Sequence, residues 1–142
     1  MGTPPHRLSI TALARSDVCA VLRLTGELDQ ASEKFFMDTV AKVVDASHRH
    51  IILDVTALTF CDSRGLNCLL ALHWLLRRRS GDLMLAGVGR RLATVLEHSG
   101  STALFSAHTS VGQALRSLPE PARPHWPPAV ERSTDEGVTP PT

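Results

Sequence analysis

A short, almost uninterrupted apolar run, Ile-Ile-Leu-Asp-Val at residues 51–55, constrains the fold more than any other feature of this chain. A strand with one solvent-facing side alternates apolar and polar residues, whereas a strand covered on both faces can be apolar throughout. The run is therefore predicted to be an inner strand. Apolar residues recur at helical spacing before it, in residues 31–46, and after it, in residues 64–79. A buried strand between two helices predicts a layered α/β fold.

Strand-like and helix-like patterns continue to alternate over the rest of the chain. Further strands are predicted at residues 9–14, 18–25 and 83–86, and further helices at residues 90–98 and 109–118. The order is β-β-α-β-α-β-α-α, with a tight turn at Ser16 and Asp17 between the first two strands. This order predicts one α/β domain: a mainly parallel four-stranded sheet with an antiparallel N-terminal edge and helices packed on it.

The two ends of the chain differ in composition from its middle. Seven of the nine prolines lie in residues 119–142, together with several charged and few large apolar residues. Such a segment buries too little surface to offset the entropy of ordering, so it is predicted to be a disordered tail. Residues 1–7, with Pro4 and Pro5, are predicted to be a flexible lead-in. The folded domain is then expected at residues 8–118.

Composition argues against several classes of function. The formal net charge of +1 gives no electrostatic footprint for nucleic acid. No apolar stretch approaches the roughly 20 residues of a membrane span, and residues 1–15 lack the apolar core of a signal peptide. Cys19, Cys61 and Cys68 have neither zinc-site nor disulfide spacing and fit a reducing cytosol. We therefore expect a cytoplasmic protein without metal, cofactor, nucleic-acid partner or membrane partner.

Three loops should meet at one edge of the predicted sheet. Residues 26–30, 60–64 and 87–90 each follow a strand, and the carboxyl ends of parallel strands share one edge, where α/β folds usually build their sites. Ser63 ends the second of these loops and opens a helix, so it is a candidate helix cap. The same place is a natural anion site, because the free N–H groups and the dipole of a helix N-terminus favour negative charge. A phosphate on Ser63 would then change the surface and leave the fold intact.

Two segments of the chain resemble a known family. The stretch from Ile51 to Leu66, which contains Cys-Asp-Ser-Arg-Gly, resembles the phosphoacceptor loop of STAS-domain anti-sigma-factor antagonists. Leu-Thr-Gly-Glu-Leu-Asp at residues 24–29 resembles the second-strand signature of that family, and residues 81–100 resemble its closing strand and helix. The resemblance covers nearly all of residues 8–118, and the two motifs in this order are fairly specific. It implies a single STAS-like domain.

The resemblance also implies a function. In this family the serine after the loop aspartate is phosphorylated by a partner, a GHKL-type serine kinase that is also the anti-sigma factor. The unphosphorylated antagonist binds that kinase and frees the sigma factor; phosphorylation breaks the complex, and a serine phosphatase resets it. Matched by position, Ser63 is the implied phosphoacceptor, and Asp29 and Asp62 are implied partner-contacting or acceptor-orienting acids. Gly65 is expected to let the partner backbone approach. Arg64 replaces the family's usual small hydroxyl residue, and it can pair with the phosphate.

A second interpretation assigns the same fold but no kinase partner. The chain would then be a non-phosphorylated STAS scaffold subunit of a stress-sensing or transport assembly. Whether Ser63 accepts phosphate from a neighbouring kinase distinguishes the two interpretations.

Enzymatic interpretations have weaker support. A hydrolase elbow, Gly-X-Ser-X-Gly, is absent, because Cys61 stands at the first glycine position before Ser63. Gly87 and Gly89 follow a predicted strand as in a dinucleotide loop, but the third glycine is missing and a tight turn explains them. We therefore expect a binding module and not an enzyme.

Overall fold

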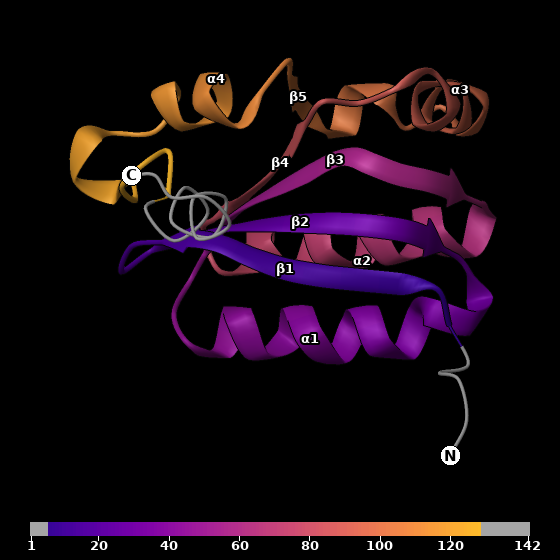
Figure 1. Ribbon diagram of the computed structural model, residues 1–142, viewed down its shortest axis with the longest axis horizontal. Helices are drawn as coiled ribbons and strands as arrows, with labels where there is room; N and C mark the ends of the chain where they lie inside the picture. Colours follow the sequence, from indigo (N-terminus) through magenta and orange to yellow (C-terminus); the bar gives the residue numbers. More distant parts are fainter. Residues whose placement is uncertain (1–5, 129–142) are drawn as a thin grey trace, which may run out of the picture.

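The apolar run at residues 51–55 lies in the central strand of a five-stranded sheet. The computed structural model describes residues 6–128, and its strands are ordered β1-β2-β3-β4-β5 (Figure 1). Strand β3, His50–Cys61, places Ile51 and Leu53 in one hydrophobic cluster and Ile52 in another, on the opposite face. Both faces of β3 are therefore covered, as the unbroken apolar run predicts.

The other elements follow the predicted alternation. The remaining strands are β1 (Leu8–Arg15), β2 (Cys19–Leu28), β4 (Asp82–Ala86) and β5 (Ser106–His108). Strands β1 and β2 are antiparallel, and the pairs from β2 to β5 are parallel. The helices are α1 (Glu33–Asp45), α2 (Ser63–Arg78), α3 (Arg90–Ser99) and α4 (Val111–Arg116), with 3-10 turns at Gln30–Ser32, Thr102–Leu104 and Glu120–Ala122.

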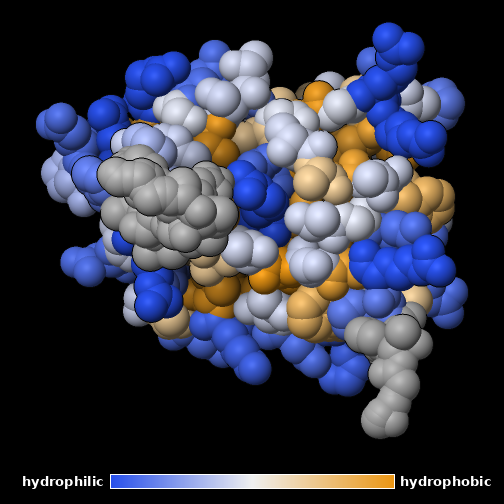
Figure 2. Space-filling view, viewed as in Figure 1, coloured by the Kyte–Doolittle hydropathy of each residue, from blue (hydrophilic) through white to orange (hydrophobic). Residues whose placement is uncertain are grey.

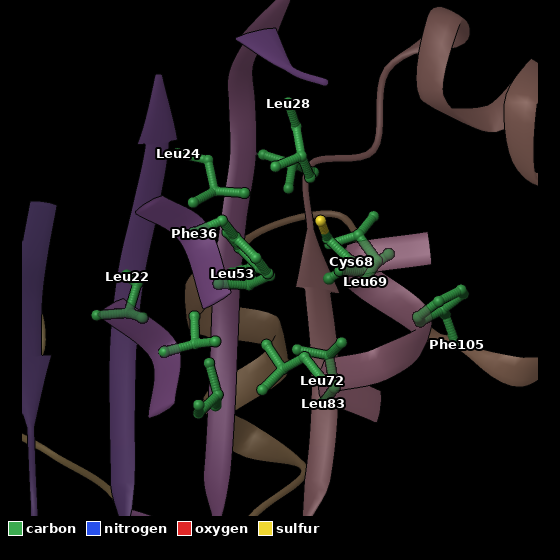
Figure 3. Packing of buried hydrophobic residues seen from close by; sticks show 14 of the residues in the cluster. Leu22, Leu24, Leu28, Phe36, Leu53, Cys68, Leu69, Leu72, Leu83 and Phe105 are labelled. Atoms are coloured by element: carbon green, nitrogen blue, oxygen red, sulfur yellow. The ribbon is translucent and has the colours of Figure 1, made fainter. Parts of the chain in front are cut away.

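Aliphatic side chains fill two cores, one on each face of the sheet. The larger core lies between the sheet and helices α1, α2 and α3, where Phe36, Leu53 and Leu72 are fully buried (Figure 3). The smaller core lies under α4 and includes Ile52 and Leu115. Burial of each such side chain contributes about 1.5–3 kcal/mol, so these leucines and isoleucines hold the layers together with few aromatic residues.

The predicted fold class is confirmed, with one strand missed. Strand β5 has only three residues, Ser-Ala-His, and two of them are exposed, so it carries no apolar pattern. The sheet therefore has five strands where the pattern predicts four. Strand β3 also continues well beyond residue 55, to Cys61. Gly100 ends α3 with φ 74°, which is the left-handed conformation expected of a glycine at that position.

The packed chain continues beyond the predicted boundary at Leu118. Ser16 Oγ donates a hydrogen bond to Ala122 O at 2.6 Å, and Ala122 and Trp126 pack against the smaller core. This segment joins no sheet and needs few backbone donors, so its prolines do not prevent it from covering apolar surface. The prediction of a disordered tail that begins at residue 119 is therefore wrong for residues 119–128. The rest of that predicted tail, and residues 1–5 of the predicted lead-in, lie outside the described residues.

Trp126→Ala is expected to lower the free energy of unfolding by about 2 kcal/mol, because it removes a half-buried aromatic side chain from the smaller core. Urea unfolding followed by circular dichroism measures the change. The neighbouring His125 is exposed, so His125→Ala is the matched control and should change stability by less than about 0.5 kcal/mol. If both substitutions changed the free energy of unfolding equally little, Trp126 would not be part of the packed domain, and the domain would end at Leu118 as predicted.

Candidate functional site

Two acidic loops meet at the carboxyl ends of β2 and β3. The register pairs Leu28 with Cys61, the last residues of the two strands, so Asp29 and Asp62 leave the sheet side by side. Together with Gln30 and Ala31 they line an open hollow of about 470 Å³. Two of the three predicted loops therefore contribute to one hollow, and residues 87–90 do not line it.

Each of the two carboxylates accepts a hydrogen bond from a backbone N–H group in the first turn of the helical segment that follows it. Asp29 Oδ1 accepts from Ser32 N at 3.1 Å, and Ser32 Oγ accepts from Asp29 N at 2.9 Å, which completes a capping box. Asp62 Oδ1 accepts from Gly65 N at 2.9 Å and caps α2. The other oxygen of each carboxylate makes no hydrogen bond within residues 6–128. Each aspartate is thus fixed by one oxygen, and its second oxygen is left unbonded by residues 6–128.

Ser63 is the first residue of α2, and it is exposed. Asp62 is the cap, so Ser63 stands next to the capping position and does not cap the helix itself. Within the described part of the chain, the Ser63 hydroxyl makes no hydrogen bond. A free hydroxyl at a helix N-terminus can receive a phosphoryl group without loss of any bond that the fold uses.

Arg64 is already paired. Its Nε and Nη2 atoms donate to Glu33 Oε1 at 3.3 and 3.0 Å, and the ion pair ties the start of α2 to the start of α1. The sequence suggests a pairing between Arg64 and a phosphate on Ser63; in the unmodified protein the guanidinium faces Glu33. Glu33 is a site residue that sequence reasoning missed, since only the packing of α1 beside α2 brings it near Arg64.

Gly65 is buried, and its missing side chain serves the fold. A Cβ atom at this position would lie 2.1 Å from Leu28 O and 2.9 Å from Cys61 Sγ. The start of α2 therefore rests directly on the end of β2. This internal contact by itself requires a glycine here, and the approach of a partner backbone to Gly65 stays a prediction.

An exposed aromatic residue borders the acidic loops. Phe60, near the end of β3, is 42% exposed, and its neighbour Thr59 donates to Gly26 O at 3.0 Å. Sequence reasoning did not single out Phe60, although a phenylalanine just before a polar loop is a recognisable signal. Aromatic residues on protein surfaces are typical anchors of interfaces; Phe60 pairs with Glu27 of β2 and does not itself line the hollow.

The thiols beside the site are unreactive. Burial, and then the nearby Asp62 carboxylate, raises the pKa of Cys61 to about 12, and burial raises the pKa of Cys68 to about 11. Both side chains therefore stay protonated at neutral pH, and a protonated thiol is a poor nucleophile. Within residues 6–128, no three His, Cys, Asp or Glu side chains are grouped so that they could hold a metal ion. No helix in the same range is long and apolar enough to cross a membrane.

Comparisons with known proteins agree with this geometry. The sequence profile of the STAS domain matches residues 10–114. An anti-sigma F factor antagonist from Paenibacillus polymyxa is 27% identical over 99 residues, which cover 69% of this chain and 85% of that protein.

Solved structures share the fold at lower identity. An anti-sigma factor antagonist from Mycobacterium paratuberculosis superposes with a TM-score of 0.67 at 24% identity, over 83% of this chain and 98% of that one. The Bacillus cell fate determinant SpoIIAA in its phosphorylated form superposes with a TM-score of 0.58 at 22% identity, over 78% of this chain and 99% of that one. A sulfate transporter family protein from Wolinella succinogenes superposes with a TM-score of 0.61 at 20% identity, over 70% of this chain and 83% of that one. The profile match spans most of the sheet and its helices, and this chain belongs to the STAS domain family.

Proposed function

We propose that this protein is an anti-sigma-factor antagonist that binds an anti-sigma-factor serine kinase, frees the sigma factor, and is switched off by phosphorylation of Ser63. The observation that carries the proposal is the Ser63 hydroxyl, which is exposed and has no hydrogen bond in the described residues. It follows Asp62, whose carboxylate lines an open hollow together with Asp29. The Paenibacillus polymyxa relative is an anti-sigma F factor antagonist, and SpoIIAA has a phosphorylated form.

The helix start allows the fold to accept the modification. The Ser63 oxygen would attack the γ-phosphorus of ATP bound to the kinase; its proton passes to a base of the kinase, and ADP leaves. The product carries about −1.5 to −2 charges at the positive end of α2, where negative charge is favoured. Neither the Asp62 cap nor the Gly65 contact needs to change. The modification would therefore alter the surface and leave the packing intact.

Release of the partner follows from like charges. To receive phosphate, Ser63 must lie close to the nucleotide phosphates in the kinase. After transfer, the phosphate on Ser63 would face those phosphates in a desolvated interface, where like-charge contact costs several kcal/mol. Arg64 offsets little of this repulsion, because exchange of its exposed ion pair with Glu33 for one with the phosphate would contribute only about 0–1 kcal/mol. We place this partner switching in the cytoplasm, with a serine phosphatase as the resetting enzyme and no catalytic role for the chain itself.

Asp29→Asn tests the acidic hollow. The substitution keeps an oxygen that can cap the Gln30–Ser32 turn and removes the charge. Binding to the anti-sigma kinase, measured by calorimetric titration, should weaken about 10-fold, as expected when one charged contact of an interface is removed. Asp17→Asn, at the turn between β1 and β2, is the matched control and should bind as the unmodified protein does. Equal affinities of all three proteins would remove Asp29 from the interface.

A second candidate function is a scaffold subunit of a transport or stress-sensing assembly. The match to the sulfate transporter family protein from Wolinella succinogenes favours it, because the same fold occurs there. In that case Ser63 would remain unmodified when a purified anti-sigma kinase and ATP are added. Phosphate uptake at Ser63 separates the two functions.

A further inference from the structure

A small cavity lies at the other end of α1 from the acidic hollow. It has a volume of about 200 Å³ and sits between the β1–β2 hairpin and the last turns of α1. Its walls are mostly apolar and include Ala12, Ala20, Leu22 and Val43. The alanines explain the space, because larger residues at these positions would fill the gap between hairpin and helix. Figure 2 shows apolar side chains along the line between β1 and α1, with hydrophilic ones on either side.

Basic side chains surround this apolar space. Arg15 of β1 and Lys42 of α1 line the cavity, are exposed, and form no ion pair within residues 6–128. His48 also lines the cavity and is only 8% exposed. Its Nδ1 lies 3.1 Å from Val43 O, and its Nε2 makes no hydrogen bond in the described residues. The Nε2 atom is not among the enclosed polar atoms that lack a partner, so it is open to solvent or to a ligand and can bond either.

We infer that this cavity binds a short aliphatic carboxylate, with the chain in the apolar space and the carboxylate between Lys42, Arg15 and His48. An apolar cavity of about 150 Å³ is known to bind benzene, so a space of this size suffices for an alkyl chain of about five carbons. Charge-assisted bonds from lysine and arginine to a carboxylate are stronger than neutral ones, and they select the acid over the alcohol. The site shares no residue with the acidic hollow and is separate from the proposed partner surface.

The test titrates the full-length protein with hexanoate and follows backbone amide shifts by NMR. Hexanoate should shift the amides of Ala20, Val43 and Ala46 and saturate in the millimolar range, as expected for a ligand with so few heavy atoms. Hexanol has the same chain without the charge and should bind at least 5-fold more weakly. Acetate has the charge without the chain and should give no saturable shift.

Substitutions separate recognition from general solvent effects. Lys42→Gln combined with Arg15→Gln should weaken hexanoate binding at least 10-fold; both residues are exposed, so the fold is unaffected. Lys34→Gln changes an exposed lysine on the same helix that does not line the cavity, and it should bind hexanoate as the native protein does. Hexanoate affinity that is unchanged in the double variant, or equal affinity for hexanol, would overturn the proposal. So would shifts that spread over the surface without saturation.

Discussion

Phosphorylation of Ser63 should weaken binding of the anti-sigma kinase by about 100-fold or more. A desolvated like-charge contact costs several kcal/mol, and each 1.4 kcal/mol is a factor of ten in affinity. The free energy of unfolding should change by less than about 1 kcal/mol, because Asp62 holds the cap and the phosphate lies at the favourable end of α2. Calorimetric titration of both forms with the kinase measures the first effect, and urea unfolding measures the second.

Two variants control this prediction. Ser63→Ala loses a hydroxyl that no described residue bonds, so it should fold and bind the kinase like the unmodified protein and stay bound when ATP is added. Ser63→Asp adds about one charge in place of nearly two and should bind with intermediate affinity. A phosphorylated protein that binds as tightly as the unmodified one would show that the surface around Ser63 is not the contact. A large loss of stability on phosphorylation would show that the helix start cannot hold the phosphate.

Gly65→Ala should be strongly destabilising, although it adds only one methyl group. The new Cβ would lie 2.1 Å from Leu28 O, a backbone atom at the end of β2, so α2 and β2 must move apart by about an ångström. Overpacking of this kind costs about 1–3 kcal/mol, and here it would also displace the Asp62 cap. We expect a loss of about 2–3 kcal/mol in unfolding free energy, together with weaker kinase binding.

Gly112→Ala is the matched control. Gly112 lies in the first turn of α4, and the nearest atom to its added Cβ would be Arg116 Nη1 at 3.7 Å. The same change there should be neutral or stabilise by up to about 1 kcal/mol, because alanine favours a helix more than glycine does. If Gly65→Ala behaved like Gly112→Ala in urea unfolding, the close contact between α2 and β2 would be refuted.

The features that could be predicted from sequence are those that depend on local pattern. Strand β3 has a continuous apolar run, and α1 and α2 have helical spacing, so the α/β alternation and the meeting of Asp29 with Asp62 follow from the order of elements. The motif around Ser63 identified the family for the same reason, since all its residues are consecutive.

The features that could not be predicted depend on contacts between distant segments. The Glu33–Arg64 ion pair joins residues that are 31 positions apart in the sequence, and neither residue has a local pattern that points to the other. Strand β5 is defined by pairing with β4 and not by its own three residues. Trp126 covers the smaller core although its neighbours are prolines, because packing against an existing surface requires no regular structure of its own.

Phosphorylation of Ser63 is tested by the intact mass of the protein after incubation with its anti-sigma kinase and ATP, followed by mapping of the modified peptide. We expect one added phosphate on Ser63, removed by a serine phosphatase, and none on Ser63→Ala. Exposed Thr59, four residues earlier, is the internal control and should remain unmodified. Stoichiometric phosphate on Ser63→Ala, or no phosphate on the native protein under conditions in which the kinase binds it, would contradict the account.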